Sequence, residues 1–176
     1  DQYIKKREYG WERSHITPDM RAQKYDHKSA FIVLTGDIDT GKQRIAKALE
    51  EALFNLGRFV YFLGISNRLA LASHDSKDKT LGKFEQIQQL GELAHLMTDA
   101  GLILITSITN IDEYELEMLK KLNSPSRMFV INVGENGFSD KQVDLALIEN
   151  EDPESAIKKI VDLLVKSLVL DPEYFI

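Results

Sequence analysis

Cysteine is absent from this chain of 176 residues, which excludes disulfide bonds, thiolate catalysis and thiolate metal sites. No apolar run approaches the ~20 residues that a membrane-spanning helix needs, and no secretory signal pattern is visible. An excess of positive charge is also lacking, because the formal net charge is −6, and this argues against a nucleic-acid partner. We therefore expect a cytoplasmic protein that engages neither membranes nor nucleic acid.

The remaining composition is that of one ordinary globular domain, with 43% hydrophobic and 28% charged residues. Residues 1–29 are polar and show no clear periodicity. We interpret them as a leader that packs onto the domain or links it to an upstream one, and we assign residues 30–176 to the domain itself. Because the sequence begins with Asp1 rather than Met, we expect it to be part of a longer protein.

Apolar runs alternate with segments of helical spacing along the rest of the chain. Such runs are typical of strands buried on both faces. The predicted strands are 30–35, 58–63, 102–106, 128–133 and a short 145–148. The predicted helices are 42–56, 83–100, 112–122 and 153–168, with a loop over 64–82. This order predicts an α/β fold with a five-stranded, mainly parallel sheet and helices on both faces.

The turn between the first predicted strand and the first predicted helix reads GDIDTGKQ and fits the phosphate-binding pattern G-x-x-x-x-G-K. Backbone N–H groups in such a loop surround phosphate, and Lys42 would reach the β- and γ-phosphates. The candidate nucleotide-binding residues are Gly36, Asp37, Ile38, Asp39, Thr40, Gly41, Lys42 and Gln43. The motif in this context predicts the P-loop NTPase fold, although a loop that only connects strand to helix remains the alternative.

The loop departs from the motif at its last position, where Gln43 replaces a Ser or Thr. The missing hydroxyl is a ligand of Mg²⁺, and an amide oxygen is a poorer and differently placed one. Asp37 and Asp39 add negative charge, and at ~4 Å and an effective dielectric near 20 each repulsion would reach about 4 kcal/mol if the side chain faced the phosphates. We therefore expect a loop that can still accept ATP but holds Mg²⁺ poorly.

Several stretches resemble the adenylylsulfate kinase family, and together they cover nearly the whole chain. The leader from Trp11 to Lys28 is similar to the W…T…R…HK of that family. Residues 90–94 (LGELA) and 98–103 (TDAGLI) resemble its V-G-E-V-A…A-D-A-G-L-I segment, which is the most specific match. The resemblance implies a P-loop kinase that transfers the γ-phosphoryl of ATP to the 3′-hydroxyl of adenylylsulfate.

The acceptor-binding motifs of that family are changed in this chain. Where D-G-D-N-x-R should end the second strand, Asn67 stays in register and Arg68 is displaced by one position, and these two are the weak candidates for substrate contact. The motif R-E-N-I-R-R corresponds to FEQIQQ at 84–89, and F-I-S-P-x-R corresponds to ITNIDE at 108–113. The lid motif K-D-P-K-G-L-Y is reduced to residues 134–143, which carry a single lysine, Lys141.

Phosphoryl transfer depends on positioning and on charge neutralisation by Mg²⁺, Lys and Arg. Because this chain keeps only Lys42 of those groups, we predict no phosphoryl transfer and assign no catalytic residue and no metal ligand. The resemblance implies a structural or regulatory domain, fused to or associated with a sulfate adenylyltransferase-type domain and able to form a homodimer. Two alternatives remain: a nucleotide sensor, and an active kinase with a replacement carboxylate from Asp39, Asp75 or Asp112.

Overall fold

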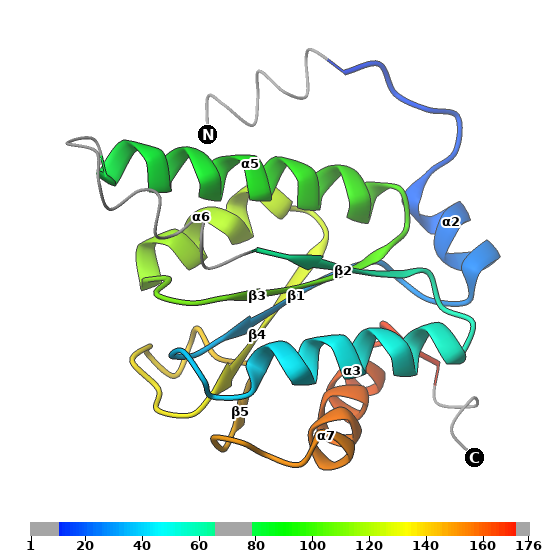
Figure 1. Cartoon of the computed structure of the whole chain (residues 1–176). Coiled ribbons are helices and arrows are strands. Elements are labelled where there is room, and N and C mark those ends of the chain that lie inside the picture. The colour runs from blue at the N-terminus through cyan, green and yellow to red at the C-terminus, as the bar shows by residue number, and fades with distance from the viewer. Residues whose placement is uncertain (1–10, 66–78, 172–176) are drawn as a thin grey trace.

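The computed structural model describes residues 11–65 and 79–171, which form one parallel sheet of five strands between two helical layers (Figure 1). The strands are β1 (Ala30–Thr35), β2 (Val60–Gly64), β3 (Ile103–Ile108), β4 (Arg127–Val133) and β5 (Leu145–Leu147). They lie in the order β2-β3-β1-β4-β5, and every pair is parallel. The predicted α/β fold and sheet are therefore confirmed.

Two helices cover each face of the sheet (Figure 1). The helices are α2 (Pro18–Tyr25), α3 (Lys42–Asn55), α5 (Lys79–Asp99), α6 (Glu113–Asn123) and α7 (Pro153–Lys166). Within β1, Ile32 and Leu34 pack with α3 and α7, whereas Phe31 and Val33 pack with α5 and α6. This alternation explains the continuous apolar run in the sequence, because both faces of β1 are buried.

One helix was not predicted, and one predicted boundary was wrong. Helix α2 lies inside the leader, and none of its residues is buried, so it leaves no apolar period in the sequence. Its start is nevertheless marked by Thr17, whose hydroxyl accepts from Met20 N, and by Pro18 in the first turn. Helix α5 begins at Lys79, inside the expected loop over 64–82.

The glycines of the most specific sequence match are required by close packing. A Cβ on Gly91 of α5 would lie 2.5 Å from Leu122 Cδ1 of α6, so the two helices approach each other closely here. Gly101 has φ +97°, and a Cβ there would lie 2.6 Å from the Tyr25 ring of α2. Both glycines therefore have structural roles, at a helix crossing and beneath the leader.

His27 joins the leader, the edge strand and the C-terminal segment. Its side chain is 4% exposed, Nε2 accepts from Phe59 N at 3.2 Å, and Nδ1 lies 3.1 Å from Lys28 O. This pattern fits the neutral tautomer with the proton on Nδ1, and the backbone of His27 also forms an antiparallel bridge with Leu170. Burial lowers the pKa of His27, while the hydrogen bond to Lys28 opposes that shift.

We expect Gly91→Ala to lower the free energy of unfolding by about 1–3 kcal/mol, because the added methyl group overpacks the α5–α6 contact. Gly82→Ala in the same helix is the matched control, since a Cβ there meets no atom within 4 Å. Alanine is the better helix former, so the control should be neutral or stabilising by up to about 1 kcal/mol. Urea unfolding measures both, and equal values for the two variants would contradict the close approach at Gly91.

We expect stability to fall as the pH drops below about 6.5, the ordinary pKa of histidine. The folded state lowers the pKa of His27, so the unfolded chain takes up the proton first. The stabilisation is complete above pH 6.5 and is lost as the pH falls toward the lowered pKa. Urea unfolding between about pH 5.5 and 7.5 should show that the free energy of unfolding depends less on pH in His27→Gln than in the wild type. The pH dependence should be unchanged in His15→Gln, which alters an exposed histidine. The same pH dependence in the wild type and in His27→Gln would refute this.

Candidate nucleotide-binding site

The loop that follows β1 crosses the carboxyl end of the sheet and leads directly into α3. Gly36 has φ +146°, and a Cβ there would lie 2.4 Å from Val133 O, so only glycine lets the loop pass this close to β4. At the far end, Gly41 is the N-cap of α3 with φ +89° and no side-chain capping bond. The first N–H groups of α3 therefore have no side-chain partner at the cap, which is the arrangement that receives an anion.

Lys42 braces the loop from inside. Its Nζ donates to Asp37 O at 2.9 Å, and Thr40 Oγ1 donates to the same carbonyl at 3.1 Å. Lys42 is 7% exposed. Burial lowers the pKa of Lys42, and the carboxylates of Asp37 and Asp39 oppose this shift. The ammonium is thus held in the loop next to two negative charges.

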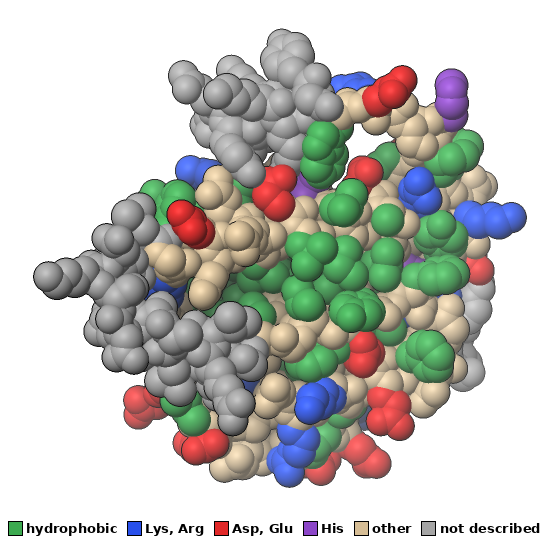
Figure 2. All heavy atoms as spheres, turned by 45° about the horizontal axis from the view of Figure 1, so that its top comes forward, with side chains coloured by type: hydrophobic (Ala, Val, Ile, Leu, Met, Phe, Trp, Pro, Cys, Tyr) green, Lys and Arg blue, Asp and Glu red, His purple; other side chains and the backbone are tan. Residues whose placement is uncertain are grey.

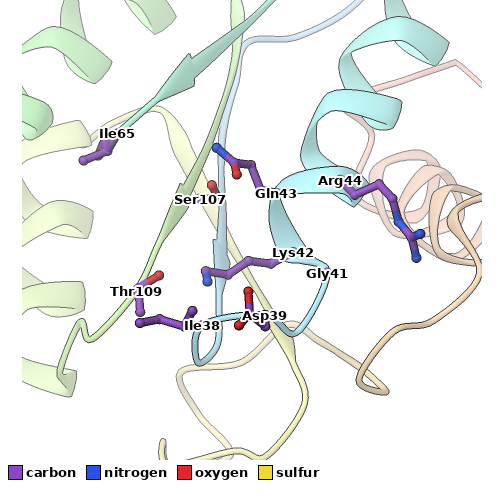
Figure 3. A pocket seen from close by; sticks show the side chains of 9 residues that line it. All are labelled: Ile38, Asp39, Gly41, Lys42, Gln43, Arg44, Ile65, Ser107 and Thr109. Carbon is purple, nitrogen blue, oxygen red and sulfur yellow. The ribbon is translucent and has the colours of Figure 1, made fainter. Parts of the chain in front are cut away.

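A cavity of about 440 Å³ opens between the loop and the ends of β2 and β3 (Figure 3). Its lining is Ile38, Asp39, Gly41, Lys42, Gln43, Arg44, Ile65, Ser107 and Thr109. Figure 3 shows Gln43 directed toward Ser107 and Ile38 toward Thr109, whereas Arg44 points away from the cavity. Among these lining residues, Lys42 is therefore the one cation that faces the space.

Strand β3 and the residues just after it supply hydroxyl groups to this cavity. Thr106 Oγ1 donates to Leu63 O at 2.9 Å and so ties β3 to β2, while Ser107 and Thr109 line the cavity. Within residues 11–65 and 79–171, no group of three or more His, Asp or Glu side chains is arranged to hold a metal ion.

Asn132 at the end of β4 positions the turn behind the loop, and the sequence reading missed it. It is 1% exposed, its Oδ1 accepts from Thr35 Oγ1 at 2.9 Å, and its Nδ2 donates to Gly134 O and Glu135 O at 3.2 and 3.0 Å. Thr35 and Asn132 are directly paired in the β1–β4 register. A polar residue at or near the end of each apolar run, Thr35 in AFIVLT and Asn132 in MFVINV, was the signal that could have revealed this pair.

The connection between β5 and α7 supports the loop from the other side. Asn150 N donates to Thr40 O at 2.9 Å, and Asn150 Oδ1 lies 3.5 Å from where a Cβ on Gly41 would be. Asn150 adopts the left-handed conformation, with φ +55°. This contact links segments 110 positions apart, so the sequence offered no local signal for it.

A smaller cavity of about 300 Å³ lies on the β4 side of the loop and is acidic. Gly36 and Asp37 line it together with Asp112, Glu113 and Glu135. Asp112 caps α6 in a capping box with Glu115, with bonds of 2.7 and 3.0 Å. Of the three replacement carboxylates considered above, Asp39 lines the main cavity, Asp112 lines this one, and Asp75 lies outside the described residues. The substrate candidates Asn67 and Arg68 also lie outside them.

Comparison with known proteins agrees with the resemblance in the sequence. The family described as adenylylsulphate kinase matches residues 28–160. The adenylyl-sulfate kinase of Escherichia coli O1:K1 / APEC is 32% identical in an alignment of 158 residues, and the match covers 85% of this chain and 70% of that protein.

Solved structures show the same fold. An APS kinase of Mycobacterium tuberculosis in complex with AMPPNP and APS has a TM-score of 0.65 and 16% identity, over 78% of this chain and 98% of that one. A hexameric APS kinase from Thiobacillus denitrificans has a TM-score of 0.67 and 18% identity, over 83% of this chain and 30% of that one. At these identities the two structures are similar to this chain in fold alone.

We expect Asn132→Ala to lower the free energy of unfolding by about 1–3 kcal/mol, because it leaves the Thr35 hydroxyl and two turn carbonyls without their partner. Asn136→Ala is the control, since Asn136 is exposed and accepts one local bond from Phe138 N. The control should change stability by less than about 0.5 kcal/mol. Urea unfolding of both variants tests the assignment, and an Asn132→Ala variant as stable as the control would refute it.

Proposed function

Because this chain belongs to the adenylylsulphate kinase family, we propose that it is a member without phosphoryl-transfer activity that has a structural or regulatory role in sulfate activation. The observation that carries this proposal is the main cavity at the P-loop. Gln43 occupies the position of the Mg²⁺-binding hydroxyl, and among the described residues that line the cavity Lys42 is the one cation facing the space. Phosphoryl transfer needs the metal and several cations to neutralise the charge that develops on the transferred group.

The polar groups around Lys42 support the same conclusion. Its ammonium donates to the backbone carbonyl of Asp37 and lies near the carboxylates of Asp37 and Asp39, which partly offset its positive charge. The end of β3 adds Ser107 and Thr109, which are neutral. These groups can bind phosphate oxygens but cannot replace an arginine clamp, which is worth about 10³-fold or more in such reactions.

The same geometry favours a second function, nucleotide binding without turnover. The loop has the glycines, the bracing lysine and the uncapped helix N-terminus that hold phosphate. The Mycobacterium tuberculosis APS kinase similar in fold was solved with AMPPNP and APS. We propose that this chain accepts ATP or a related nucleotide as an anion at backbone N–H groups, with little contribution from Mg²⁺. An active kinase that uses Asp39, Asp75 or Asp112 as its replacement carboxylate is the remaining alternative.

An exposed apolar face supports a protein partner. Tyr61 of the edge strand β2 and Leu93 and Leu96 of α5 are between 39 and 52% exposed. Figure 2 shows hydrophobic side chains gathered on the face that α5 covers. Faces of this kind often mark protein contacts. We propose a homodimer or a sulfate adenylyltransferase-type domain as the partner.

We also propose that the protein is located in the cytoplasm. No helix among the described residues has the length and apolar character to cross a membrane.

We expect no conversion of ATP and adenylylsulfate to ADP and the 3′-phosphorylated product. The rate should lie at least about 10³-fold below that of the Escherichia coli relative assayed in parallel, because both the metal hydroxyl and the arginines are missing. Product formation is followed by chromatography with excess Mg²⁺. A rate less than about 10³-fold below that of the relative would overturn the proposal. If Asp39→Asn then abolished this turnover, the active-kinase alternative would be favoured.

A further inference from the structure

The P-loop site has an inner part, where the two phosphates nearest the nucleoside would rest on the loop, and an outer part beyond Lys42, where a third phosphate would lie. The charges around these two parts differ. From this difference we infer that the site selects nucleoside diphosphates over nucleoside triphosphates. The inference rests on the nucleotide binding proposed above and specifies which nucleotides the site takes. It concerns a ligand preference and is independent of whether the chain has any transferase activity.

The inner part of the site binds through uncharged backbone donors. Gly41 caps α3 without a side-chain bond, and Lys42 and Thr40 hold the Asp37 carbonyl, which fixes the loop around the helix N-terminus. Asn150 N donates to Thr40 O and supports the loop from outside. Two phosphates resting on these groups meet a rigid set of N–H donors and the ammonium of Lys42.

Among the described residues, the outer part of the site offers no cation to a third phosphate. Beyond Lys42 the cavity is lined by Gln43, Ser107 and Thr109, which are neutral, and by Ile38 and Ile65, which are apolar. Ile38 is 58% exposed at the tip of the loop and is directed toward Thr109 in Figure 3. A terminal phosphate placed there would lose water without gaining a cation from any of these residues.

Asp39 makes this position repulsive. It lines the cavity beside Lys42 (Figure 3), and among the nine described lining residues no second cation faces the same space because Arg44 points away. In other P-loop sites, Mg²⁺ bridges the β- and γ-phosphates and offsets such repulsion. Here Gln43 stands where the metal hydroxyl would be, so a triphosphate would carry one more phosphate charge toward a carboxylate.

Calorimetric titration of the whole chain with ADP and with ATP, each with and without Mg²⁺, tests the inference. We expect ADP to bind at least tenfold more tightly than ATP, and we expect Mg²⁺ not to reverse the order. Asp39→Asn should reduce the ratio to less than threefold, mainly by strengthening ATP binding. Asn is nearly isosteric and tolerates the left-handed backbone that residue 39 adopts, with φ +65°.

Asp162→Asn is the matched control, because it removes the same charge from an exposed position more than two turns along α7 and should leave the ratio unchanged. ATP binding as tightly as ADP in the wild type would overturn the inference while leaving nucleotide binding standing. A tenfold preference that persists in Asp39→Asn would overturn the role of Asp39. No binding of either nucleotide at millimolar concentration would overturn both the inference and the proposed binding.

Discussion

The central strand β1 is buried along its whole length, and the rest of the molecule is arranged around it. Each of its six side chains has no exposed surface, since β3 and β4 flank it and a helical layer covers each face. The loop that follows such a strand begins at its carboxyl end, between the carboxyl ends of the two neighbouring strands. Gly36 passes against Val133 O there, and Thr35 meets Asn132. The P-loop therefore takes its shape from the packing of the sheet as much as from its own residues.

The sequence predicted what local pattern determines and missed what distant contacts determine. The apolar run of β1 and the Asp152–Pro153 start of α7 were both predicted and are present in the structure, because buried strands and capped helices leave signals within a few residues. Helix α2 was missed, because a helix with no buried residue needs no apolar period. In the site, the loop residues could be predicted from a motif. The support at Asn150 could not, because it reaches the loop from a segment 110 positions away, and Asn132 left only the signal of a polar residue within an apolar run.

The residues of this chain that match the family for reasons of packing lie apart from those that face the phosphate site. Gly91 lets α6 approach α5, and Gly101 makes room for Tyr25, so the segment that most resembles the family is retained by packing. Gln43, by contrast, is in the first turn of α3 and faces a cavity, where a change costs little stability. A fold can thus keep its architecture while its phosphate site changes, since the two depend on different contacts. Family membership therefore says more about the sheet and helices than about the reaction.

The bridge between His27 and Leu170 joins two segments that are far apart in the sequence. Lys28 N also donates to Val169 O, so the segment that enters β1 is tied to the segment that leaves α7. The strand β1 spans about 20 Å at the usual rise per residue. Its amino end carries this tie and its carboxyl end leads into the P-loop, so a single strand anchors both the closure of the chain and the loop.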